Sequence, residues 1–145
     1  MVTLAIIGVL ASVALPLTEV AVQRSKEQEL KSSLRQIREA LDAYKQATDE
    51  GRISKSADES GYPKSLGVLV DGVEDIKDPR HRKIYFLRQL PRDPMSSDGS
   101  IPSQDTWGKR SYLSPHDNPQ GGDDVFDVYS FATGKGLNGV PYREW

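Results

Sequence analysis

Residues 1–18 decide the fold: they read MVTLAIIGVLASVALPLT and contain no charged side chain. As a helix rising about 1.5 Å per residue, this run would measure about 27 Å, close to the hydrocarbon thickness of a bilayer. It could be a cleaved signal peptide, a buried core helix or a membrane helix that stays in the mature protein. No basic residue precedes the run, which disfavours a signal peptide although Ser12-Val13-Ala14 resembles a cleavage site. The rest of the chain is too small and polar to surround a core helix, so we prefer the membrane helix.

Small residues within this run favour close packing between helices. Gly8 and Ser12 lie one helical turn apart, an arrangement that lets two backbones approach closely in lipid or in a packed bundle. We therefore expect the segment to self-associate. Pro16 removes one backbone donor and crowds the carbonyl of Ser12, so it predicts either a kink or the end of the span. Gly8, Ser12 and Pro16 are thus the candidate packing residues.

Residues 19–50 continue the helix with an amphipathic pattern. The apolar side chains recur at a 4-3-4-3 spacing, at Leu30, Leu34, Ile37, Leu41 and Tyr44. This spacing places them on one helical face, which should pack on a sheet of the remaining chain. The charged residues between them have both signs and predict a solvated face, on which Glu27 and Lys31 can pair at i and i+4. The sequence Asp49-Glu50-Gly51 predicts the end of the helix.

Residues 51–145 predict a small globular head. A short helix is expected over 63–70, because proline is favoured at the first helical position. Residues 125–131 alternate apolar and polar side chains, which is the best strand signal in the chain, and residues 109–113 predict a shorter strand. The fold class is therefore α+β, with a long N-terminal helix packed on a small antiparallel sheet.

Composition and residue types exclude several classes of function. The chain has 19 basic and 21 acidic residues, so it lacks the excess of positive charge that nucleic acid binding requires. Cysteine is absent, which excludes disulfides and thiolate metal sites but leaves a hard cation with oxygen ligands. Ser114, His116 and Asp117 are the residue types of a catalytic triad, but such close sequence neighbours rarely have the required geometry. With His81 in a charged loop, we expect no enzymatic activity.

A series of short motifs follows one order along the chain. They are the apolar run with Gly8 and Pro16, Tyr62-Pro63, Leu90-Pro91-Arg92-Asp93-Pro94, Trp107-Gly108, Tyr112-Leu113-Ser114-Pro115, Phe126-Asp127-Val128-Tyr129-Ser130 and Trp145. In this order the motifs resemble the type IV pilin-like family, and within it the major pseudopilins of type II secretion systems. The resemblance covers nearly the whole chain.

This resemblance implies a structural subunit that polymerises through its N-terminal helix into a periplasmic pseudopilus and supports protein export. The implied location is the bacterial inner membrane, with one membrane-spanning helix in contact with lipid before assembly and the head in the periplasm. The implied partners are copies of the chain, other pseudopilins and inner-membrane secretion components. A pilin of a surface fibre is an alternative, which the lack of a cysteine pair disfavours. A membrane-anchored periplasmic binding module that never polymerises remains open.

The chain also departs from the pattern of the family. The usual Phe-Thr-Leu-x-Glu start is absent, so we expect the sequence to begin several residues inside the mature protein. The contiguous Asp-Pro-Trp-Gly motif is split by residues 95–106. The loop over 117–124 is long, and Gly134 stands where the family tends to have a second aspartate after the last strand.

These last departures bear on metal binding. Members of the family bind calcium around the final strand, and only Asp127 carries over by position. Calcium accepts six to eight oxygen ligands in irregular loops, so Asp124 and Asp117 are further candidate ligands. The loop that holds them either replaces the carboxylate missing at Gly134 or is a solvated acidic loop without an ion.

Overall fold

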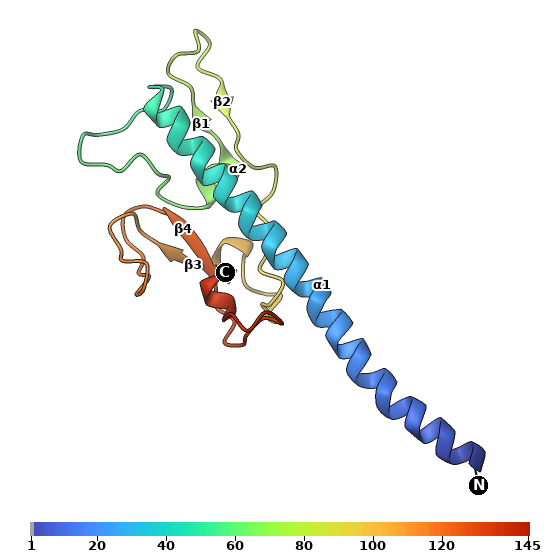
Figure 1. Ribbon diagram of the computed structural model, residues 1–145. Coiled ribbons are helices and arrows are strands. Elements are labelled where there is room, and N and C mark those ends of the chain that lie inside the picture. Colours follow the sequence, from blue (N-terminus) through green and yellow to red (C-terminus); the bar gives the residue numbers. More distant parts are fainter. Residues whose placement is uncertain (1) are drawn as a thin grey trace.

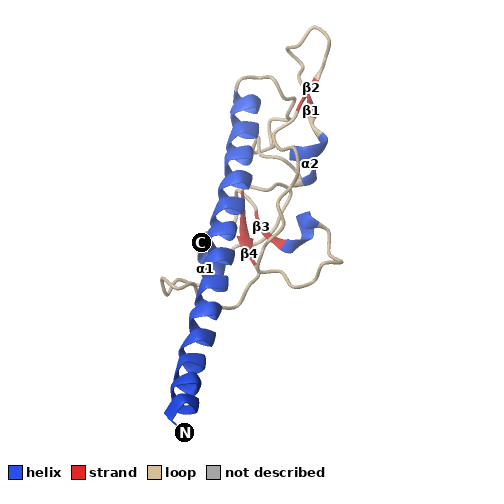
Figure 2. Cartoon of the chain, turned by 90° about the vertical axis from the view of Figure 1, so that its right-hand side faces the viewer, coloured by secondary structure: helices blue, strands red, loops and turns tan. Residues whose placement is uncertain are grey.

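The computed structural model describes residues 2–145, and the side chains from Pro16 onwards. One helix, α1 (Val2–Asp49), spans 48 residues and runs along one side of a small head, beyond which its N-terminal part projects (Figures 1 and 2). Pro16 lies inside α1, so the helix continues past the proline. The side chains of Gly8 and Ser12 lie outside the described residues. The predicted long helix and α+β fold class are confirmed.

The head contains short elements joined by long loops. In chain order they are α2 (Gly67–Asp71), β1 (Val73–Glu74), β2 (Lys83–Ile84), the 3-10 turn η1 (Ser103–Thr106), β3 (Trp107–Arg110), β4 (Asp127–Ser130) and the 3-10 turn η2 (Tyr142–Glu144). Within the described residues the strands form two separate antiparallel pairs, β1 with β2 and β3 with β4. In the second pair Trp107 lies opposite Ser130, and Arg110 lies opposite Asp127.

The predicted elements of the head form with shifted boundaries. The short helix expected over 63–70 forms over 67–71, and the strand expected over 109–113 forms at Trp107–Arg110. Strand β4 lies inside the predicted range 125–131. Strands β1 and β2 lie outside the predicted elements, because strands of two residues are too short to produce an alternating pattern.

The core lies between α1 and the head. The helix contributes Leu30, Leu34, Ile37 and Leu41, all at most 3% exposed. The head contributes Leu66, Leu69, Trp107 and Val128 to the same cluster. Complete burial of a large aliphatic or aromatic side chain contributes about 1.5–3 kcal/mol, so this face holds the helix firmly on the head. The predicted apolar stripe is therefore confirmed as the packing face, with Tyr44 only partly buried at its edge.

Two of the sequence motifs have a structural explanation in the sheet of β3 and β4. Asp93 is 3% exposed and accepts a hydrogen bond of 2.6 Å from the Ser130 hydroxyl, which ties its loop to β4. At Gly108 a Cβ atom would lie 2.3 Å from the ring of Tyr129, so only glycine leaves room for this ring.

Helix α1 also ends as predicted, because Gly51 has a φ of +74° and the Arg52 amide donates to the Ala47 carbonyl at 2.9 Å.

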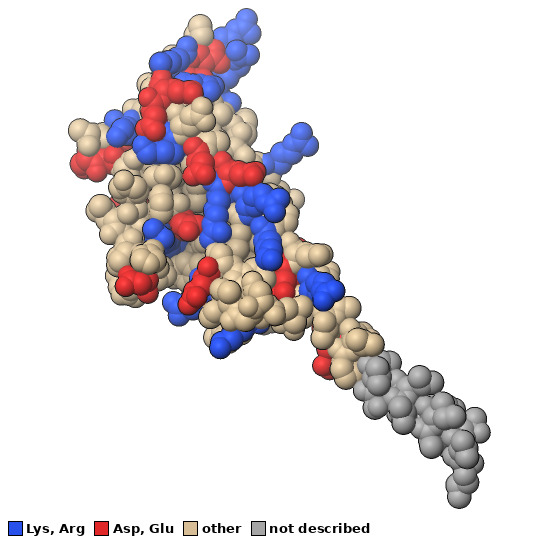
Figure 3. Space-filling model, viewed as in Figure 1, with Lys and Arg blue, Asp and Glu red and all other residues tan. Residues whose placement is uncertain are grey.

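Charges of both signs are interspersed over the face of the molecule in Figure 3, along the described part of α1 and across the head. The loop between β1 and β2 lies at the far end of the head from the helix N-terminus and carries several basic residues (Figure 1). The described surface of α1 thus carries charges of both signs, as the sequence predicts. The exceptions are the exposed apolar residues Leu17, Val20 and Val22.

Candidate functional site

The segment of α1 that leaves the head exposes apolar side chains. Leu17 is 65% exposed, Val20 39% and Val22 51%. Isolated apolar residues are common on surfaces, but three exposed ones within residues 17–22 of a projecting helix indicate that another molecule covers this segment. Across residues 16–145, where side chains are described, no helix is long and apolar enough to cross a membrane. The predicted span over 1–18 lies mostly outside these residues.

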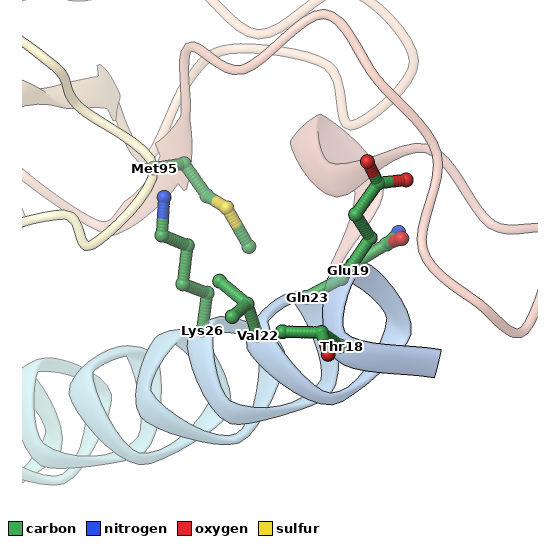
Figure 4. Close-up of a pocket in the computed structure, with 6 residues that line it drawn as sticks. All are labelled: Thr18, Glu19, Val22, Gln23, Lys26 and Met95. Atoms are coloured by element: carbon green, nitrogen blue, oxygen red, sulfur yellow. The ribbon is translucent and has the colours of Figure 1, made fainter. Parts of the chain in front are cut away.

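A groove of about 380 Å³ lies beside this segment, between α1 and the residues that interrupt the Asp-Pro-Trp-Gly motif. Figure 4 shows Met95 reaching towards Val22 and Lys26 of α1, whereas Glu19 and Gln23 extend away from Met95 at the other end of the groove. The wall is mainly aliphatic, since the Lys26 stem and the Met95 thioether add to Val22. Such a groove suits an apolar side chain and offers no set of catalytic groups.

Glu27 fastens α1 to the C-terminal segment. Its carboxylate is buried and accepts hydrogen bonds from the Tyr142 hydroxyl at 2.8 Å, the Leu137 amide at 2.8 Å and the Gln23 side chain at 3.2 Å. Burial raises the pKa of Tyr142, and the bond to Glu27 adds to this, although Gln23 opposes it. The prediction that Glu27 belongs to a solvated face is therefore wrong. The expected ion pair with Lys31 is not among those of the described residues.

Arg38 makes a second link between α1 and the head. Its Nε atom lies 2.8 Å from Asp127 Oδ1, and its Nη2 atom donates to the carbonyls of Val128 at 3.2 Å and Trp145 at 2.7 Å. The Nζ atom of Lys31 lies 4.9 Å above the ring of Trp145. Two residues expected on a solvated face, Lys31 and Arg38, thus hold the last residues of the chain against the helix.

Asp124 joins three segments of the head. It accepts hydrogen bonds from the hydroxyls of Ser60 and Ser111, the latter at 2.6 Å, and from the Tyr112 amide at 3.2 Å. Burial acts to raise the pKa of Asp124, but the hydrogen bonds from Ser111, Ser60 and the backbone amides together outweigh it and hold the pKa below its ordinary value. The carboxylate is therefore ionised at neutral pH and stabilised by neutral donors.

The three predicted calcium ligands do not come together. Asp127 is engaged by Arg38, Asp124 by hydroxyl groups, and Asp117 is exposed in its loop. In residues 16–145 no group of three or more acidic or histidine side chains lies close enough to hold a metal ion. At Gly134 a Cβ atom would lie 3.3 Å from the Tyr142 ring, so an aspartate would be crowded there. The residues as arranged do not fit a calcium ion, and calcium binding stays a prediction from the sequence.

Sequence reasoning missed Glu27 and Arg38 because both were assigned to the solvated face of α1. One signal for Glu27 was present: extending the apolar stripe three residues back from Leu30 reaches this position. Nothing local marks Arg38, whose partners lie about ninety or more residues further along the chain.

A long helix that projects from a small α+β head, with exposed apolar side chains where it leaves the head, defines a pilin-like subunit. Two curated proteins are similar to the chain, and both are named type II secretion system core protein G. The protein from Dickeya chrysanthemi is 29% identical over 147 residues, covering 96% of this chain and 89% of the relative. The protein from Klebsiella pneumoniae is 30% identical over 131 residues, covering 86% of each chain.

The chain therefore belongs to the family of type II secretion system core protein G, the major pseudopilins. This confirms the resemblance found in its motifs. No protein-family model and no solved structure matches the chain.

Proposed function

We propose that this protein is a structural subunit that polymerises through α1 into the periplasmic pseudopilus of a type II secretion system, without catalytic activity of its own. The observation that carries the proposal is the helix leaving the head with Leu17, Val20 and Val22 exposed. The names of the two relatives give the same function class.

The links between α1 and the head support this function mechanically. Glu27 and Arg38 bind the C-terminal residues from two places along the helix, in addition to the apolar core. The projecting part of α1 is thereby held at one orientation relative to the head. A repeated head-to-tail contact between rigid subunits that does not close into a ring produces a helical filament.

The membrane and partner assignments belong to the same proposal. Residues 1–18 would lie in the inner membrane before assembly, because they carry no charge and are long enough to reach across its apolar layer. The head would lie in the periplasm. Copies of the chain, other pseudopilins and inner-membrane secretion components would be its partners.

The test is electron microscopy of cells that overproduce the full chain together with its secretion system, comparing the parent with Val22→Glu and Val22→Ile. A charge at this exposed apolar position should abolish filaments, whereas isoleucine should keep them. Protease resistance of the head must be equal in all three proteins, since Val22 makes no core contact among the described residues.

The alternatives give different outcomes in the same experiment. Fibres that extend from the cell surface without any effect on secretion would indicate a surface pilin. A parent protein that stays in the membrane as single subunits would indicate a binding module and contradict the proposal.

A further inference from the structure

Oxygen acceptors converge at the start of β4 in a way that resembles a cation site. The carboxylate of Asp127 and the backbone carbonyls of Val128 and Trp145 all face one point. Carboxylate and carbonyl oxygens are the ligands that calcium prefers in proteins. In this chain the guanidinium of Arg38 stands at that point and donates to all three. Its planar guanidinium offers several N–H donors in a fixed geometry.

The carboxylate of Asp127 has a cation beside it without an added ion. The groove that contains Arg38 and Trp145 is also lined by two cationic and two acidic side chains, namely Lys31, Arg35, Glu39 and Asp42. Arg38 pairs with Asp127 at 2.8 Å, so this carboxylate already has a cation beside it. A divalent ion placed beside Asp127 would repel the guanidinium of Arg38 and would have to displace it.

The second candidate carboxylate is also occupied. Asp124 takes three hydrogen bonds from Ser60, Ser111 and Tyr112, so its charge is stabilised without a metal. Asp127 and Asp124 therefore each have partners supplied by the chain. A metal would have to replace both sets of contacts.

We propose that Arg38 is the resident cation of the head: it takes the role of a metal ion by joining α1, β4 and the C-terminal segment, and the head therefore folds independently of calcium. The acidic loop over 117–124 had raised the opposite expectation, that the head binds calcium. It concerns the fold of one subunit and does not depend on the proposed polymerisation, so either can fail alone.

The first test is a thermal melt of the full chain in a non-ionic detergent, followed by near-ultraviolet circular dichroism of its tryptophans. The melting midpoint should be the same in millimolar calcium and in excess chelator. A rise of several degrees with calcium would overturn the proposal and support the calcium site, because an ion that binds the native state alone raises the midpoint.

The second test replaces the cation. Arg38→Gln should lower the midpoint by several degrees, Arg38→Lys should lower it less, and the control Arg35→Gln should leave it unchanged, because exposed Arg35 lines the same groove. A midpoint of Arg38→Gln equal to that of the parent would refute the role of Arg38.

A double-mutant cycle separates this role from simple packing. Asp127→Asn should lower the midpoint in the parent and much less in the Arg38→Gln protein, because the charge it removes is then already unpaired. Equal decreases in both backgrounds would mean that the two residues act independently, and the proposal would fail.

Discussion

The hydroxyl of Tyr142 donates a hydrogen bond of 2.8 Å to the carboxylate of Glu27, across 115 residues of sequence. This contact places the end of the chain beside the part of α1 where the helix begins to leave the head. It sets the boundary between the helix segment that belongs to the head and the segment that projects from it.

Glu27→Ala should destabilise the head by about 1–3 kcal/mol, because it leaves the Tyr142 hydroxyl and the Leu137 amide without their acceptor in a buried place. The free energy of unfolding in urea measures the effect. The control is Glu29→Ala, an exposed position on the same helix, which should change it by less than about 0.5 kcal/mol. Equal effects of the two substitutions would contradict the role of Glu27.

A fragment that begins at Gln23 should be soluble and monomeric. It lacks the exposed apolar residues up to Val22 but keeps Gln23, whose side chain bonds Tyr142 at 2.9 Å. Light scattering gives its mass in solution. A stable oligomer would place the assembly surface on the head and count against polymerisation through the projecting helix.

Asp124 should make the head sensitive to acid. Its pKa in the folded protein lies below the ordinary value of 3.8, so its contribution to stability is complete above pH 3.8 and is lost as the pH falls through the folded pKa. At neutral pH, Asp124→Asn should therefore be less stable than the parent by about 1–3 kcal/mol.

This difference in unfolding free energy should shrink as the pH falls below about 4. Denaturation series at several pH values measure it. The neighbouring substitution Asp123→Asn removes the same charge from an exposed residue and should have little effect at any pH. If the parent and Asp124→Asn differ by the same amount at pH 7 and pH 3, the hydrogen bonds do not depend on the ionised carboxylate.

Gly8→Leu should hinder filament formation while the protein remains in the membrane, because a large side chain prevents close approach of two helices at a position one turn from Ser12. Electron microscopy and membrane fractionation together measure this. Gly8 lies outside the described side chains, so the prediction rests on the sequence alone. Filaments as abundant as those of the parent would rule out close packing at this site.

Local patterns predicted much of the architecture. The spacing of Leu30, Leu34, Ile37 and Leu41 placed the packing face of α1, because residues three and four apart share one side of a helix. The alternation of apolar and polar side chains over 125–131 located β4, because successive side chains of a strand point to opposite faces. Both patterns depend only on the geometry of neighbouring residues.

The sequence by itself determined the long helix, its apolar start, its buried stripe and the family. Only the tertiary structure decided the partners of the polar residues: Glu27 with Tyr142, Arg38 with Asp127, and Asp124 with Ser60 and Ser111. The reason is physical. A backbone periodicity repeats within a few residues, whereas the pairing of a charge depends on which distant segment the folded chain brings within about 3 Å. For that reason an aspartate predicted as a metal ligand is found beside an arginine from the opposite part of the chain.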